Sequence, residues 1–170
     1  MSAFPDWQKH AVNQRRPATG CIPTAYEMML RAANVAGIDF AGFQDEFDLD
    51  KNGGSPKNHF VSVGKAVQAK YPGVEFVCEP FAKGKGQEKV ARIDELLGQK
   101  KPVLVSIANA AFGGPGWHIM PIVDATADEF VLLEYVEPSG KTHTKPIKKA
   151  DVAKIHDNHA GGDEIAYLKI

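Results

Sequence analysis

Apolar side chains recur at helical spacing in the segment that begins at Cys21, which reads CIPTAYEMMLRAANVAG. Proline is tolerated in the first turn of a helix and glycine commonly follows the last turn, so Pro23 and Gly37 mark the two ends. The pattern predicts a buried central helix with Cys21 at its start. The positions that share its buried face are Ile22, Ala25, Met29 and Ala32.

The rest of the hydrophobic pattern predicts more helices early in the chain and mostly strands later. Residues 39–56 are acidic and rich in glycine, which indicates irregular structure, and NAAFGGPGW at 109–117 is typical of a loop. Helical spacing recurs at 56–71 and 87–100 and, in a short polar segment, at 148–156. Strand-like composition occupies 74–81, 103–108, 118–125, 130–137 and 164–170, and the third and fourth of these strands form a hairpin.

This order favours an α+β fold, with helices packed to one side of an antiparallel sheet, over a regular parallel α/β fold. A chain of 170 residues has the usual size of one domain, so we expect a single domain over residues 1–170. Its 44% of hydrophobic and 24% of charged residues are typical of a globular protein. Disorder, collagen and coiled coil are thereby excluded.

The charge balance argues against nucleic acid and membranes as partners. Twenty basic and 21 acidic residues give a formal net charge of −1, which offers no field to attract polyanions. No apolar stretch approaches the roughly 20 residues that cross a bilayer, and the start MSAFPDWQKH does not resemble an export signal. We therefore expect a cytoplasmic protein.

The sequence predicts neither a metal site nor a cofactor. Two cysteines are too few for a disulfide framework or a cysteine-rich zinc site, so we treat both as free thiols. DLDKNGG at 48–54 matches the opening of a calcium-binding EF-hand loop, but the twelfth position is His59 instead of glutamate, which favours a simple turn. His156 and His159 have no obvious further ligands, and KGKGQ lacks the spacing of a phosphate-binding loop.

Cys21 and His118 are the candidates for nucleophilic catalysis. The N–H groups and the positive dipole at the start of a helix lower the pKa of a thiol, and so does a neighbouring imidazolium. Cys21 lies at a predicted helix start, so it is a candidate nucleophile. His118 opens a strand after the glycine-rich loop and is the best placed of the six histidines to act as its base. Cys78 lies in an apolar strand without these features, so we expect a structural role for it.

Acyl transfer also needs an oxyanion donor and a group that orients the imidazole. Gln14 lies shortly before Cys21 and could supply a side-chain amide to the oxyanion. The antiparallel partner of the His118 strand offers Glu134 and Glu137, which period-two alternation places on opposite faces, so at most one can serve. We favour Glu134 because a charge inside an otherwise apolar strand needs a partner, and Glu137 is the alternative.

With these parts in place, the chain resembles the papain-like cysteine peptidases, most closely those that process bacteriocins with double-glycine leaders. The resemblance rests on NQRRPATGCIPTAYEMML and on KPVLVSIANAAFGGPGWHIMPIVDATADEFVLLEYVEPSG. It implies a papain-like fold, with Cys21 as nucleophile, His118 as general base and acid, and Gln14 as oxyanion donor. Three departures are a longer gap from glutamine to cysteine, a tryptophan just before the histidine, and no aspartate or asparagine at the orienting position.

The leading hypothesis is a cysteine-dependent hydrolase that cleaves a peptide or isopeptide amide bond through a thioester on Cys21, with a peptide or protein as its substrate. One alternative is a papain-like binding or regulatory module that has lost turnover. Another is a deamidase or a transglutaminase-like acyl transferase, because the first acylation step is shared. The substrate and the oligomeric state cannot be predicted from the sequence.

Overall fold

The computed structural model describes residues 6–15, 20–48, 59–112, 114, 116–159 and 164–169. Within this part of the chain, no helix is long and apolar enough to cross a membrane. In chain order the elements are α1 (Trp7–His10), α2 (Cys21–Ala32), α3 (Phe43–Glu46), α5 (His59–Lys70), β1 (Phe76–Pro80), α6 (Gly86–Gly98), β2 (Val103–Ala108), the 3-10 helix η2 (Asn109–Phe112), β3 (Trp117–Ala125), β4 (Glu129–Val136), β5 (Thr142–Lys148), α7 (Lys149–Asn158) and β6 (Glu164–Leu168).

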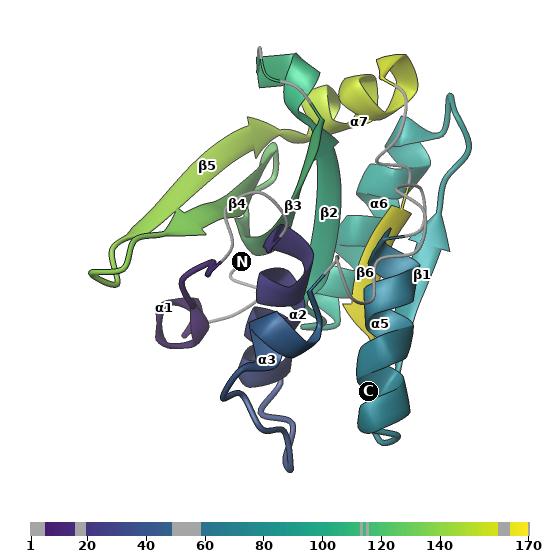
Figure 1. Cartoon of the computed structure of the whole chain (residues 1–170). Helices are drawn as coiled ribbons and strands as arrows, with labels where there is room; N and C mark the ends of the chain where they lie inside the picture. Colours follow the sequence, from purple (N-terminus) through teal and green to yellow (C-terminus); the bar gives the residue numbers. More distant parts are fainter. Residues whose placement is uncertain are drawn as a thin grey trace.

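The six strands form one sheet in the order β1-β6-β2-β3-β4-β5, and every neighbouring pair is antiparallel (Figure 1). The α+β fold class is therefore confirmed. Five of the strands match the segments predicted from composition, whereas β5 is an addition. Its sequence THTKPIK carries Lys145 and Pro146, which are typical of an edge strand that pairs on one side only, and so it lacks the apolar pattern of the others.

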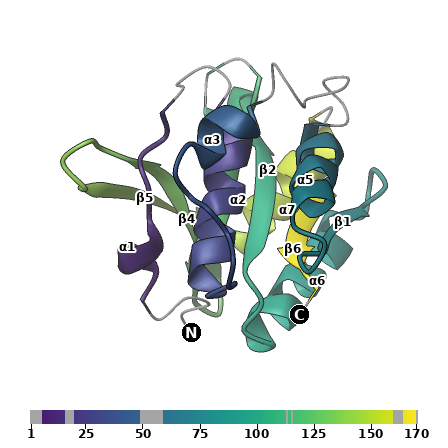
Figure 2. The same cartoon turned by 60° about the horizontal axis from the view of Figure 1, so that its bottom comes forward.

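Helices cover both faces of the sheet, so the prediction of helices on one side only is wrong. α2, α3 and α5 lie on one face, and α6 and α7 lie on the other (Figures 1 and 2). Strand β2 is buried along its whole length because it packs against both layers. Val103, Val105 and Ile107 belong to the core cluster that includes α6 and α7, whereas Leu104 belongs to the cluster around α2 and α5.

Helix α2 begins at Cys21, as predicted, but ends at Ala32 instead of continuing to Gly37. Asn34 adopts a left-handed backbone conformation with φ of 52°. The N–H of Val35 bonds to the carbonyl of Leu30 at 3.2 Å, and the N–H of Asn34 bonds to the carbonyl of Arg31 at 3.0 Å. These two bonds form a Schellman motif, which ends the helix before any glycine is reached.

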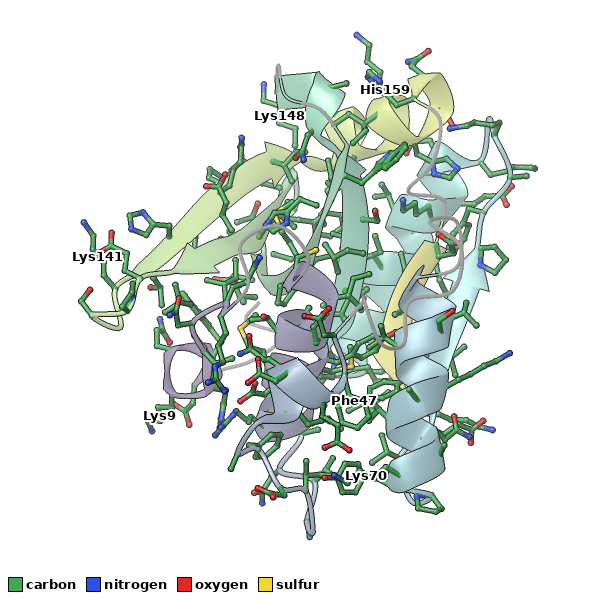
Figure 3. The ribbon with its side chains drawn as sticks, in the orientation of Figure 1. Lys9, Phe47, Lys70, Lys141, Lys148 and His159 are labelled. Atoms are coloured by element: carbon green, nitrogen blue, oxygen red, sulfur yellow. The ribbon has the colours of Figure 1, made fainter. Side chains whose placement is uncertain are left out.

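An aromatic cluster holds α3 against the layer formed by α2 and α5. The ring of Phe47 lies 4.7 Å from that of Phe43 and 6.5 Å from that of Tyr71, measured between centroids. Figure 3 shows Phe47 between α3 and α5. Phe43 and Phe47 are buried, so this four-residue helix owes its position to packing rather than to its own hydrogen bonds.

Strands β3 and β4 separate at one end, and this separation creates the space for a site. Their ladder covers only Ile122 to Ala125 on β3. The next residue towards the start of β3 is Pro121, which has no N–H to donate to a ladder. On the other side of β4, the register with β5 shifts between Leu133 and Tyr135, so Glu134 is the extra residue of a β-bulge.

Candidate active site

A cavity lies between the start of α2 and the point where β3 and β4 separate. It brings together all four residues favoured from the sequence, namely Gln14, Cys21, His118 and Glu134. Glu137, the alternative to Glu134, is not among the described residues that line this cavity. The described residues that line it are Val12, Gln14, Cys21, Thr24, Met28, His118, Ile119, Pro121, Leu133, Glu134 and Val136.

Cys21 is half-buried in the first turn of α2, after Gly20 at the N-cap position. Burial is the largest influence on its thiol and raises the pKa above the ordinary value. Main-chain hydrogen bonds from Ile119, Ile22 and Cys21 itself favour the thiolate and lower the pKa, but by less. A position at a helix start predicts a lowered pKa, but desolvation outweighs that effect here.

The main chain of Ile119 connects Cys21 to the opposite wall of the cavity. A main-chain hydrogen bond from Ile119 is one of the influences that lower the pKa of the Cys21 thiol. Ile119 directly follows His118 in β3, and both residues line the cavity together with Cys21. The packing of α2 on β3 thus brings the thiol and the imidazole, which are far apart in the sequence, to the same cavity.

The hydrogen bond at His118 determines which of its ring nitrogens can act as a base. Nε2 of His118 lies 2.9 Å from the main-chain carbonyl oxygen of Glu134. A carbonyl oxygen can only accept, so Nε2 carries the hydrogen in this bond. In the neutral ring, Nδ1 then keeps its lone pair and is the nitrogen available to take a proton.

Glu134 therefore contacts His118 through its main-chain carbonyl, whereas the prediction was a contact through its carboxylate. Within the strand registers described, neither β3 nor β5 offers Glu134 a paired residue, because it is the bulge residue of β4. Its carbonyl is thereby left to accept from the imidazole. Glu137 lies 2.6 Å from Nε2 of His143 through its Oε1 and accepts a bond from Ser139 at 3.2 Å.

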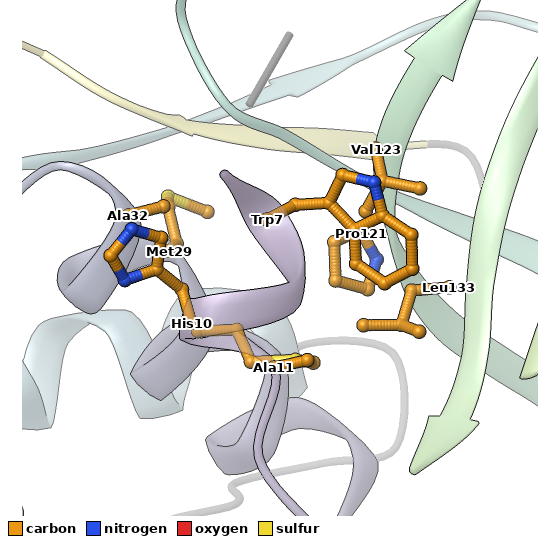
Figure 4. Close-up of a pocket in the computed structure, with 9 residues that line it drawn as sticks. Trp7, His10, Ala11, Met29, Ala32, Pro121, Val123 and Leu133 are labelled. Atoms are coloured by element: carbon orange, nitrogen blue, oxygen red, sulfur yellow. The ribbon is translucent and has the colours of Figure 1, made fainter. Parts of the chain in front are cut away.

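An apolar hollow adjoins the cavity and shares Met28, Pro121 and Leu133 with it. In Figure 4 the indole of Trp7 lies beside Pro121 and Leu133, near the place where β3 and β4 separate. Trp7 belongs to α1, and Val12 and Gln14 follow that helix closely in the chain. Because α1 packs in this hollow, the chain that follows α1 carries Gln14 to the cavity.

Cys78 lies in β1, away from this cavity. Its Sγ is 3.9 Å from the hydroxyl of Tyr26, which is fully buried. Burial is the largest influence on the Cys78 thiol and raises its pKa, whereas the hydrogen bond to Tyr26 lowers it. No histidine takes part in the described contacts of Cys78, which fits the structural role expected from the sequence.

The part of the chain that the structure describes contains no group of three or more histidine, cysteine or acidic residues able to hold a metal ion. Most of the calcium-like segment 48–54 lies outside the described residues. Of the two late histidines considered as ligands, His156 is buried, with Nε2 at 2.9 Å from the carbonyl of Ala82. This bond joins α7 to the segment that precedes α6.

Comparison with known proteins supports the fold. No family model matches the sequence, and neither does any curated protein. A crystal structure from Bacillus anthracis, described there as that of a proposed C39-like peptidase, is similar with a TM-score of 0.62 and 14% sequence identity. The match covers 96% of each chain, so the arrangement of helices and strands is shared over almost the whole length.

Proposed function

We propose that this chain is a cysteine-dependent hydrolase that cleaves a peptide or isopeptide amide bond through a thioester on Cys21. The observation that carries the proposal is the cavity in which a thiol at a helix start, an imidazole with Nδ1 left as acceptor and a carboxamide meet. The likeness to a structure described as a proposed C39-like peptidase agrees with this chemistry. The same fold makes a papain-like peptidase the preferred class of hydrolase.

In the acylation step, Nδ1 of His118 takes the thiol proton while Sγ of Cys21 attacks the carbonyl carbon of the substrate. The carbonyl oxygen becomes an oxyanion that accepts hydrogen bonds from the Gln14 carboxamide and the main-chain N–H of Cys21. The tetrahedral intermediate then collapses, the C–N bond breaks, and His118 returns the proton to the leaving amine. A thioester on Cys21 remains.

In the deacylation step, His118 takes a proton from water, and the hydroxide attacks the thioester carbonyl. The same donors hold the second oxyanion. When the C–S bond breaks, the proton returns to the sulfur, so that the enzyme is regenerated with a neutral thiol. A resting thiol agrees with the raised pKa of Cys21, because burial disfavours the thiolate until a base assists its formation.

The remaining features of the proposal concern the protein as a whole. We propose one domain over residues 1–170, acting in the cytoplasm on a peptide or protein substrate, without nucleic acid or membrane as a partner and without a cofactor. The raised pKa of Cys21 equally favours a second candidate, a papain-like binding or regulatory module without turnover. Thiol reactivity separates the two.

Iodoacetamide should label Cys21 at least about tenfold faster than Cys78 at neutral pH, because Cys21 shares its cavity with His118, whereas the described contacts of Cys78 include no histidine. His118→Ala should slow the labelling of Cys21 and leave that of Cys78 unchanged. Burial raises the pKa of both thiols, so both rates should rise as the pH passes through and beyond the ordinary thiol range. The effect of His118→Ala should therefore shrink at alkaline pH, where deprotonation needs no base. Mass spectrometry of the labelled peptides measures each rate, and equal slow labelling of both thiols would defeat the catalytic proposal.

Glu134→Gln should change turnover by no more than about threefold. The imidazole is held by the main-chain carbonyl of Glu134, which the substitution keeps, and glutamine has almost the same shape as glutamate. Steady-state hydrolysis of a peptide anilide by the wild type and the variant makes the comparison. A loss of a hundredfold or more would instead give the orienting role to the carboxylate.

A further inference from the structure

The side chain of Gln44, in α3, bridges the two peptide groups on either side of Gln14. Its Nε2 donates to the carbonyl of Asn13 at 2.9 Å, and its Oε1 accepts from the N–H of Arg15 at 3.0 Å. One carboxamide thereby orients both peptide planes that meet at the Cα of Gln14. The direction in which the Gln14 side chain leaves the backbone depends on these two planes.

The orientation of the Gln44 amide is itself set by two residues of α2. Its second Nε2 hydrogen goes to Oε2 of Glu27 at 3.0 Å, and its Oε1 lies 2.8 Å from the hydroxyl of Thr24. A carboxylate accepts only, so the amide nitrogen must face Glu27, which excludes the flipped orientation. Both hydrogens of the amide are thus used, and its oxygen accepts from Arg15 and shares the single hydroxyl hydrogen of Thr24 with the carbonyl of Gly20, which lies 2.5 Å from that hydroxyl.

These groups are shielded from water and anchored at their far ends. Gln44, Glu27 and Thr24 are each exposed by 5% or less. Arg31 holds the other oxygen of Glu27, with Nε and a terminal guanidinium nitrogen both at 3.0 Å. Buried polar groups cost free energy when they lose a partner, so the arrangement favours one geometry strongly.

We propose that Gln44 is a positioning residue that aims the Gln14 carboxamide at the oxyanion formed on the Cys21 adduct, an inference that rests on the proposed function. Gln44 does not line the cavity and acts only through the backbone around Gln14. The bridge ties that segment to α2, the same helix that starts with Cys21. The backbone on both sides of the oxyanion donor is therefore tied, through Gln44, to the helix that carries the nucleophile.

The test uses N-acetyl-glycyl-glycinal, a peptide aldehyde, as a probe that needs no known substrate. The sulfur of Cys21 adds to the aldehyde carbon, and the thiol proton ends on the former carbonyl oxygen, giving a reversible hemithioacetal with no redox change. That oxygen occupies the position of the oxyanion. Protection of Cys21 from iodoacetamide as a function of aldehyde concentration gives the dissociation constant. Alkylation without aldehyde forms no oxyanion and is the internal control.

Gln14→Ala and Gln44→Met should each weaken aldehyde binding about tenfold. Gln44→Met should leave the alkylation rate without aldehyde unchanged, because Gln44 does not line the cavity. The double variant should bind no more weakly than Gln14→Ala alone, because Gln44 acts through Gln14. Gln68→Met, on the exposed side of α5, is the matched control and should bind like the wild type. Gln44→Glu keeps the shape of the side chain but sets an oxygen against the Asn13 carbonyl and Glu27. It should weaken aldehyde binding as much as Gln44→Met does, and agreement between the two variants argues that the loss in Gln44→Met is not a folding defect.

The possible failures are distinguishable. If the aldehyde does not protect Cys21 of the wild type, the proposed function fails. If it does, and the losses in Gln14→Ala and Gln44→Met multiply in the double variant, Gln44 is a structural residue and the positioning role is overturned. The same conclusion follows if Gln44→Met slows plain alkylation as much as it weakens aldehyde binding. Unchanged aldehyde binding in both Gln44 variants also overturns it.

Discussion

Replacing Cys21 by alanine should lower the hydrolysis of peptide anilides by on the order of a thousandfold or more, because the thiol that forms the covalent intermediate is lost from the cavity. The oxyanion donors and the fold remain in the variant, so substrate binding should persist. Release of the aniline from a panel of acyl-tripeptide anilides with small residues near the scissile bond measures the effect.

Cys78→Ala is the matched control for this experiment. Cys78 is the second free thiol, half-buried in β1 beside Tyr26 and outside the cavity. Its replacement should leave turnover within about twofold of the wild type. Turnover in Cys21→Ala equal to that of the wild type would show that the chain uses another nucleophile. No turnover in either protein would favour the binding module.

The products of the reaction separate a peptidase from the deamidase and transglutaminase-like alternatives. A deamidase or a transglutaminase-like enzyme forms its thioester from a glutamine side chain and releases ammonia, whereas a peptidase releases a new amino terminus. Incubation with glutamine-containing peptides, followed by mass measurement and an ammonia assay, distinguishes these products. Either activity should depend on Cys21, so the nucleophile is tested in both cases.

The sequence predicted the residues around the thiol because their signals are local. A helix start, an apolar stripe and a glycine-rich loop before a strand each depend on a few neighbouring positions. Cys21 opens α2 as expected, and His118 is the second residue of β3. Their meeting at one cavity follows from the packing of α2 on β3, which the sequence pattern did not specify.

The contacts that hold these residues in place could not be predicted from the sequence, because they depend on irregular backbone. Period-two alternation implied that at most one of Glu134 and Glu137 could serve. The β-bulge at Glu134 breaks that alternation and presents a main-chain carbonyl to the imidazole instead of a carboxylate. Gln44 lies in a segment assigned no regular structure. Its role depends on backbone groups of residues 13 and 15, which no side-chain pattern reveals.

Gly86→Ala should lower the free energy of unfolding by about 2–3 kcal/mol, because this glycine permits close contact between α6 and α7 on the face of the sheet away from Cys21. A Cβ at this position would lie 2.2 Å from the carbonyl oxygen and 2.7 Å from the Cα of Ala153. Both neighbours are backbone atoms, so the helices must move apart. The N–H of Gly86, which donates to Asp157 at 3.0 Å, would lose its partner.

Gly98→Ala is the matched control, since Gly98 ends the same helix and a Cβ there would meet nothing within 4 Å. Alanine favours helix over glycine, so this variant should be as stable as the wild type or more stable by up to about 1 kcal/mol. Thermal unfolding should show Gly86→Ala melting roughly 5–10 °C below the wild type. Labelling of Cys21 in the folded protein should be unchanged in both variants. If both variants melt like the wild type, α6 and α7 do not make the contact described. If Gly86→Ala slows the labelling of Cys21, the packing on one face of the sheet controls the geometry of the thiol on the other face.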